Sequence, residues 1–259
     1  METLKNTFVA PSGISYTIRE QNGQDEEVLT NVGAANRFMN INNFLQGIIV
    51  ESSVKPGKYT MDEILNIPLL DRQCILIQSR IFSLGNTLEF TYDWQGKDGK
   101  ARKEEYELEL SDYLLDYSKR DSITEEELLA KPDAIPFYPT PIQDLNALLT
   151  FTLASGKNIR FHILNGHSEL YIMTLDQNNA TRNTDLFARG LELQVEGKWE
   201  KVSNFSLFST KDMRELRKLV NANDPQANLN TDVEDPVTGV KDLVNIMGVP
   251  TFFFPEEDV

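Results

Sequence analysis

Apolar residues recur at helical spacing between positions 70 and 84. The residues of this stripe are Leu70, Cys74, Ile77, Ile81 and Leu84, separated by four, three, four and three positions. Such spacing places them on one face of a helix. Gly85 follows at once and is a typical helix stop. The pattern predicts a long amphipathic helix whose apolar face is buried.

The pattern after this helix changes to alternation. Leu88, Phe90 and Tyr92 alternate with polar residues, and Tyr106, Leu108 and Leu110 do the same. This period of two predicts a hairpin with one buried face, whose tip is the glycine-rich and basic stretch 93–103. A second helix is predicted from Ser209, which begins a capping-box pattern with Asp212.

Segments of the two halves of the chain correspond at a constant separation of 143 positions. The matches include Thr7-Phe8 with Thr150-Phe151, Ser12-Gly13 with Ser155-Gly156, Asn22-Gly23 with Asn165-Gly166, and Phe44 with Phe187. In each copy two short strands flank the Ser-Gly turn, and the Asn-Gly pair begins an acidic helix. The correspondence predicts an internal duplication.

These elements predict an α+β fold in which each half is a β-hairpin, two or three helices and a second hairpin. We expect repeat units at 1–111 and 142–259. Residues 112–141 are expected to form a linker, because Lys131-Pro132, Ile135-Pro136 and Tyr138-Pro139 punctuate it with proline. A short helix is expected within it, capped by the Ser122-Ile-Thr-Glu125 sequence and continuing through Leu129.

Composition narrows the classes of function. The chain is 40% hydrophobic and 9% aromatic, as expected of a folded globular protein. Its net charge of −15 repels phosphate backbones, so we expect no nucleic-acid partner. No apolar run is long enough for a bilayer, and residues 1–6 lack a signal-peptide pattern, so we expect no membrane partner. One cysteine, Cys74, allows no intrachain disulfide.

Candidate catalytic and metal-binding residues have simpler interpretations. His162 and His167 are five positions apart, without a nearby third ligand. Cys74 belongs to the apolar stripe, whereas a reactive thiol needs a partly exposed, electropositive setting. Glu104-Glu105 and Glu125-Glu126-Glu127 are typical of solvated faces. Phosphate-binding and nucleophile-elbow motifs do not occur. We therefore expect no enzyme, no cofactor and no metal.

Two features suggest protein contacts instead. The hairpin tip carries Trp94 and the basic residues Lys97, Lys100, Arg102 and Lys103 on an otherwise acidic chain. It is either a docking finger for an acidic neighbour or a charged edge that prevents strand pairing. Phe252, Phe253 and Phe254 near the chain end are either an exposed interface or a terminal strand buried on both faces.

The order of short motifs resembles that of the baseplate and tail assembly chaperone proteins of T-even-type bacteriophages. The motifs are Pro11-Ser12-Gly13, Asn22-Gly23 followed by acidic residues, Asp71-Arg72, Arg80-Ile81 with Gly85, the hairpin, and the ending Phe252-Phe253-Phe254-Pro255. The resemblance implies a viral structural or assembly protein that contacts other tail or baseplate proteins. It implies a location in the virion tail or the host cytoplasm.

One departure from that family matters. Its members often carry paired cysteines at the hairpin tip and near the C-terminal end, as a small metal ribbon would. Here those positions read Asp93-Trp94-Gln95-Gly96 and Asp235-Pro236-Val237-Thr238-Gly239. No thiolate is present, so we expect Trp94 and hydrogen bonds within the turns to order the tip.

Two other functions are consistent with the sequence. An acidic adaptor would bind a basic protein partner through one dominant interface, as the net charge allows. A carboxylate-based hydrolase would need Asp or Glu side chains that converge in a deep cleft. The sequence is silent on the oligomeric state.

Overall fold

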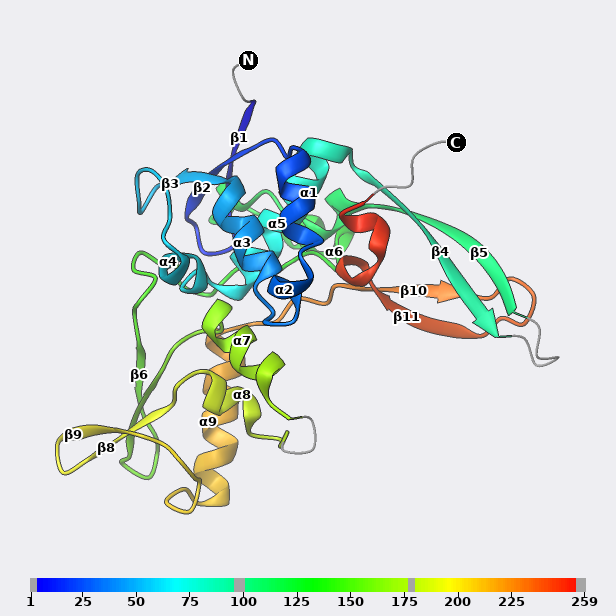
Figure 1. The fold of residues 1–259 in the computed structure, drawn as a ribbon. Helices are drawn as coiled ribbons and strands as arrows, with labels where there is room; N and C mark the ends of the chain where they lie inside the picture. The colour runs from blue at the N-terminus through cyan, green and yellow to red at the C-terminus, as the bar shows by residue number, and fades with distance from the viewer. Residues whose placement is uncertain (1–3, 96–100, 177–179, 255–259) are drawn as a thin grey trace.

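Two clusters of buried apolar side chains organise the chain (Figure 1). The computed structural model describes residues 4–95, 101–176 and 180–254. Its helices and several small antiparallel sheets make an α+β fold, as predicted. We call the parts around the larger and smaller clusters the first body and the second unit.

A three-stranded antiparallel sheet begins the first body, in the order β1-β2-β3. The strands are β1 (Lys5–Val9), β2 (Ser15–Arg19) and β3 (Ile49–Ser52). The helices are α1 (Gly23–Leu29), α2 (Val32–Ala35), α3 (Asn40–Ile48), α4 (Met61–Leu65) and α5 (Leu69–Leu84). Alternating apolar residues at β2 show why this strand belongs to the core. Ile14 precedes it, and Tyr16 and Ile18 within it are almost fully buried.

The helix predicted from the apolar stripe is α5. Leu70, Cys74 and Ile77 are at most 1% exposed, and Ile81 packs partly against the core. Leu84, in the last turn, is 37% exposed. Gly85 ends the helix with a φ of 93°, a conformation that favours glycine. The predicted stripe is therefore confirmed over most of its length, and it leaves the core only at its end.

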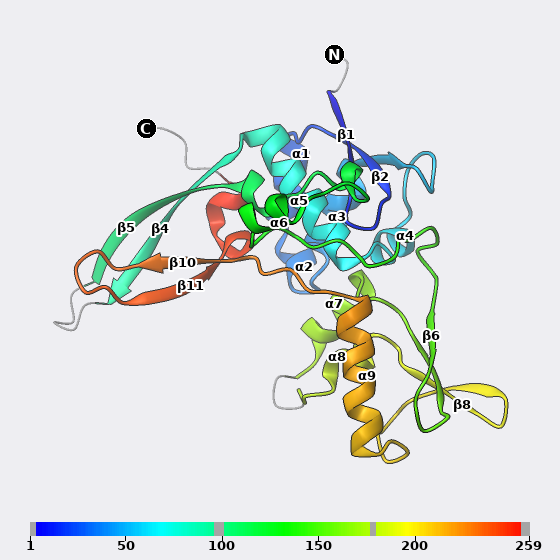
Figure 2. The same ribbon diagram turned by 180° about the vertical axis from the view of Figure 1, so that it is seen from behind.

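The second unit is a smaller lobe that lies beside the first body in both views (Figures 1 and 2). Its antiparallel sheet has the order β6-β7-β8-β9. The strands are β6 (Leu149–Thr152), β7 (Asn158–Phe161), β8 (Glu192–Val195) and β9 (Lys198–Lys201). The helices are α7 (Gly166–Thr174), α8 (Thr184–Ala188) and α9 (Thr210–Asn223). As predicted, α9 starts at a Ser209–Asp212 capping box and buries Met213, Leu216 and Val220.

Two hairpins lie side by side and extend away from the first body (Figures 1 and 2). One is the predicted hairpin, β4 (Thr87–Gln95) with β5 (Ala101–Glu109). The other is β10 (Asn230–Glu234) with β11 (Lys241–Asn245). We call this pair of hairpins the arm. The short helices η4 (Ile246–Gly248) and η5 (Pro250–Phe252) follow β11.

The packing draws the boundaries differently from the predicted units at 1–111, 112–141 and 142–259. Residues 112–141 are not a free linker. They include the end of the short helix η1 (Leu110–Tyr113) and the whole of η2 (Tyr117–Lys119) and α6 (Glu125–Ala130). Tyr117, Ile135 and Tyr138 of this segment are at most 3% exposed in the larger cluster. Proline limits the local conformation, but the apolar residues between the prolines decide where the segment packs.

The C-terminal part returns to the first body. Leu229, Val233, Ile246 and Phe252 belong to the larger cluster, whereas the smaller cluster ends at Val220. The second unit is therefore an insertion-like lobe, and the chain re-enters the first body after α9. No local sequence signal predicted this return, because it depends on contacts between distant parts of the chain.

The order of elements bears on the expected duplication without establishing it. Strand β8 begins 143 positions after β3, and the helices α1 and α7 follow Asn22 and Asn165, which cap them. Each half also has a long helix followed by a hairpin, α5 with β4–β5 and α9 with β10–β11. The second unit differs by its additional strand β9. The duplication stays a prediction.

Candidate functional site: the joint and the arm

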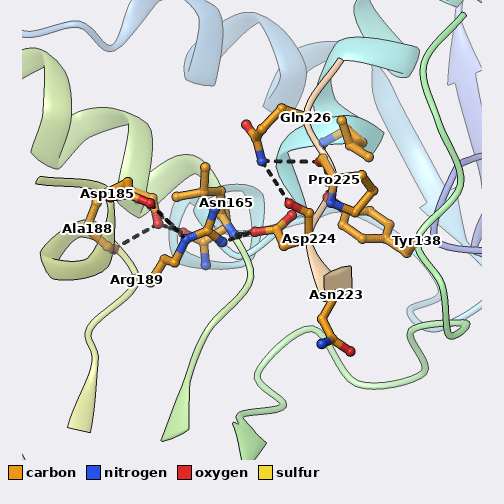
Figure 3. Close-up of polar contacts among 12 residues, drawn as sticks. Tyr138, Asn165, Asp185, Ala188, Arg189, Asn223, Asp224, Pro225 and Gln226 are labelled. Carbon is orange, nitrogen blue, oxygen red and sulfur yellow. Dashed lines mark hydrogen bonds and ion pairs between the residues drawn. The ribbon is translucent and has the colours of Figure 1, made fainter. Parts of the chain in front are cut away.

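A buried ion pair lies where the chain passes from the second unit back to the first body (Figure 3). Asp224 ends α9, since Pro225 cannot continue the helix. Its Oδ2 accepts a hydrogen bond from the Leu164 backbone N–H at 2.7 Å and an ion-pair contact from Arg189 Nη1. Asp224 and Arg189 are 1% and 2% exposed.

Burial and charge act in opposite directions on this pair. Burial raises the pKa of Asp224, and the Arg189 guanidinium opposes that rise because it stabilises the carboxylate. Removing either partner would leave an uncompensated buried charge. Figure 3 shows Tyr138 of the first body beside Pro225. The pair therefore fixes the point at which the chain crosses between the two parts.

We call the boundary between the first body and the second unit the joint. Arg72 of α5 makes a contact across it. Its Nε donates to Glu169 Oε2 of α7 at 2.7 Å, and its Nη2 donates to Asn42 Oδ1 at 2.7 Å. A Cβ at Gly166 would lie only 3.0 Å from Arg72 Nη1 and from the Cα of Leu65. Only glycine lets the start of α7 approach α4 this closely. Arg72, which belongs to the Asp71-Arg72 motif, therefore holds the first body and the second unit together.

The neighbouring carboxyl, Asp71, is fully enclosed. Its oxygens accept hydrogen bonds from the Ser12 backbone N–H at 2.9 Å, the Ser12 hydroxyl at 2.5 Å and the Tyr16 hydroxyl at 3.1 Å. Burial raises the pKa of Asp71 to about 7, and these hydrogen bonds oppose the rise. Because Asp71 has no exposed surface, the network joins the turn after β1 to the start of α5 instead of facing a substrate.

The two hairpins of the arm are joined by polar contacts. Trp94 Nε1 donates to the Tyr106 hydroxyl at 2.8 Å, which donates to the Glu234 carbonyl at 2.9 Å. Arg102 Nη2 pairs with Asp235 Oδ2 at 2.6 Å. The Thr238 hydroxyl, then the Val237 backbone N–H and then Arg102 lower the pKa of Asp235. The hydrogen bonds of Trp94 and Tyr106 and the ion pair of Arg102 therefore order the region where the two hairpins meet.

The residues predicted for the basic tip have different surroundings. Lys97 and Lys100 lie outside the described residues. Arg102 is engaged by Asp235, and Trp94 is 6% exposed. Lys103 is exposed, with its Nζ 3.9 Å from Asp93 Oδ1. Trp94 and Arg102 therefore contribute to cohesion within the arm, and they are not freely available to a partner.

The structure differs from both interpretations of the run Phe252, Phe253 and Phe254, which packs against the larger cluster. Phe252 is fully buried, and its ring lies 4.9 Å from that of Phe253, centroid to centroid. Phe253 also meets Phe44 of α3 edge to face at 5.9 Å. Phe254 is half-buried against the same cluster. The run is neither an exposed patch nor a strand, because the turn of η5 directs the rings toward the first body.

The other candidates considered from the sequence lie apart from any common centre. His162 is half-buried, and burial lowers its pKa. His167 Nε2 lies 3.4 Å from Asp62 Oδ1, so this residue belongs to the joint. Cys74 is buried, which raises the pKa of its thiol. Within residues 4–95, 101–176 and 180–254, no group of three His, Cys, Asp or Glu side chains could hold a metal ion.

One hollow lies on the second unit, between the β8–β9 hairpin and the segment that leads to α9. Its volume is about 290 Å³. Leu193, Val202 and Phe208 line it, with Lys201 and Asn204 among its polar residues. None of the residues predicted to be functional faces it.

Charge is distributed unevenly between the two parts. Residues 149–224 contain ten Lys or Arg and nine Asp or Glu, and carry a net +1. The rest of the chain contains fifteen Lys or Arg and thirty-one Asp or Glu, and carries −16. The residues outside 149–224 therefore carry all the excess negative charge, which the overall count could not locate.

Comparisons of the chain with protein-family models, with curated proteins and with solved structures find no match. In the part of the chain that the structure describes, no helix has the length and apolar character needed to span a bilayer.

Proposed function

We propose that this chain is a structural or assembly component of a contractile phage tail baseplate, and that it acts through protein–protein contacts without catalysing a reaction. The observation that carries the proposal is the shape and charge of the first body. It is strongly acidic, and it projects an arm of two hairpins held together by Trp94, Tyr106 and Arg102. The projecting arm offers contact surface to a neighbouring protein, and the acidic charge favours a neighbour with a complementary basic surface.

The buried polar groups agree with a structural role. Asp71, Arg72, Arg189 and Asp224 are all at most 2% exposed, and each contacts groups from separate segments of the same chain. Asp71 joins two segments of the first body, the Arg189–Asp224 pair joins two segments of the second unit, and Arg72 joins the two parts. The order of sequence motifs adds the assignment to a phage baseplate, which rests on resemblance alone.

The charge distribution favours a second candidate, an acidic adaptor that binds a basic protein. A net −16 on one part of the chain would steer a basic partner toward that part. A hydrolase has less support, because the carboxyl whose pKa is raised to about 7, Asp71, is fully buried.

Quantitative mass spectrometry of purified particles and of lysates from the producing cells tests the proposal. Peptides of this chain at a fixed ratio to known tail subunits in particles would support a structural component. Peptides confined to lysate fractions that contain tail intermediates would support an assembly factor. Their absence from both the particles and the tail intermediates would reject the baseplate proposal and favour the adaptor.

A further inference from the structure

Helix α6 (Glu125–Ala130) differs from the other helices of the first body, because none of its residues is buried. Leu128 and Leu129 are 42% and 73% exposed. Figure 2 shows α6 on the surface of the first body, near the root of the arm. The chain therefore displays two adjacent leucines on a formed helix without covering them.

The helix is held in place by polar contacts at its ends. Thr124 and Glu127 form a capping box, with the Thr124 N–H and hydroxyl donating to Glu127 Oε2 at 2.8 and 2.9 Å. After the helix, Lys131 Nζ donates to the carbonyls of Ser111 and Leu114 at 2.7 and 3.1 Å. The helix and its base are thus fixed before any partner arrives, which lowers the entropic cost of binding.

These polar contacts do not explain why Leu128 and Leu129 are exposed to solvent. A helix of six residues is marginal without packing, and α6 has caps but no buried side chain of its own. Recognition of a helix in an apolar groove uses exposed apolar side chains of the helix as its anchors. A partner that covered Leu128 and Leu129 would supply the packing that the chain leaves out.

Charge indicates what that partner is. Glu125, Glu126 and Glu127 are all exposed beside the leucines. The nearby cations are already engaged, Lys131 by two carbonyls and Lys119 by Asp116 at 3.2 Å. A second copy of α6 would bring like charges together, which disfavours self-association. A groove lined by apolar residues and edged by Lys or Arg would match both features.

We propose that α6 is a docking helix whose Leu128 and Leu129 enter an apolar groove edged by basic residues on a neighbouring protein. This inference rests on the proposed function, since it names the surface and the partner chemistry for those contacts. It assigns the contact to α6, and not to the phenylalanine run, which packs against the first body.

The test uses the full chain and two helical-hairpin peptides as probes. In one peptide the two helices form a leucine-lined groove edged by lysines, and the other has glutamates in place of the lysines. Titration calorimetry compares the parent protein with a Leu128→Ser, Leu129→Ser double variant. The matched control is Leu207→Ser, which changes a leucine that is 61% exposed on the second unit. Circular dichroism verifies that each variant is folded.

We expect the lysine peptide to bind the parent and the control equally, and the double variant at least tenfold more weakly. Glu125→Lys with Glu126→Lys should weaken it by a similar factor, and these changes leave the capping residue Glu127 intact. The position of binding is reported by a bimane label on Ala130→Cys, an exposed position beside the leucines that leaves both intact, because Cys74 is buried. Its emission should shift to the blue.

Three results would overturn the inference. Equal binding to the parent and the double variant would show that the peptide follows net charge alone. Equal binding of the glutamate peptide would reject the basic edge. Sedimentation that detects self-association, lost in the double variant, would assign α6 to a second copy instead. None of these results alters the particle mass spectrometry, so failure of this inference can be distinguished from failure of the proposed function.

Discussion

Replacing Phe252 tests whether the C-terminal part is integral to the first body. The side chain is fully buried, so Phe252→Ala removes a whole ring from the core and its edge-to-face contact with Phe253. Truncations of this kind cost about 3–5 kcal/mol of unfolding free energy. For a chain of this size, that loss corresponds to a fall in Tm of roughly 6–20 °C.

The assay is urea denaturation followed by tryptophan fluorescence. A Trp199→Phe background leaves Trp94, which lies in the first body's core cluster, as the reporter. Leu243→Ala is the matched control, because Leu243 is 63% exposed on β11 and its loss should change stability by no more than about 0.5 kcal/mol. If Phe252→Ala and the control had the same urea midpoint as the parent, the C-terminal return to the core would be refuted.

Three further substitutions test the buried polar and apolar groups. Asp224→Asn should destabilise the chain by about 3–5 kcal/mol, because it leaves the Arg189 charge buried without its partner; thermal denaturation would measure this. Asp71→Asn should flatten the pH dependence of stability, measured by urea midpoints from pH 4 to 8. Ile77→Asp should unfold the first body, because it places a charge where the side chain is fully buried, and circular dichroism would show the loss.

The sign of the pH effect follows from the direction of the Asp71 shift. Its pKa is about 7 in the folded chain and about 4 in an unfolded one, so the folded state holds the proton more tightly. The stability this provides is complete below about pH 4 and is lost as the pH rises toward about 7. A parent protein as stable at pH 7.5 as at pH 4.5, with Asp71→Asn unchanged from it, would contradict this assignment.

The contradicting outcomes for the other two substitutions are equally specific. An Asp224→Asn protein with the parent's melting temperature would show that the ion pair contributes nothing at the joint. An unchanged melting curve for Ile77→Asp would show that the apolar stripe is not buried. The first result concerns only the Asp224–Arg189 ion pair, and the second concerns only the burial of Ile77.

The parts of the fold that were predictable from the sequence are local ones. Helical spacing identified α5, a capping box identified the start of α9, and alternation identified the β4–β5 hairpin. These signals act between residues a few positions apart, where backbone geometry fixes which side chains share a face. The α+β class follows from the same patterns.

The long-range contacts were not predictable in this way. Phe252 packs with residues far earlier in the chain, and Asp224 pairs with Arg189 through an approach that no local pattern specifies. Asp224 did carry one signal, since Asp-Pro after an amphipathic stretch marks a helix end. Prolines between 132 and 141 suggested a linker, but Ile135 and Tyr138 supply buried surface that binds this segment to the first body. The exposure of Leu128 and Leu129 also emerged only from the folded chain.

Electron microscopy of particles made without this chain tests the central claim most directly. Under the baseplate proposal the gene lies in a phage genome, so it is deleted there, and a plasmid supplies the parent protein in a parallel culture. The account predicts filled heads without complete contractile tails, and tails restored by the plasmid. Complete, contractile tails at the normal yield without the protein would contradict a role in the baseplate.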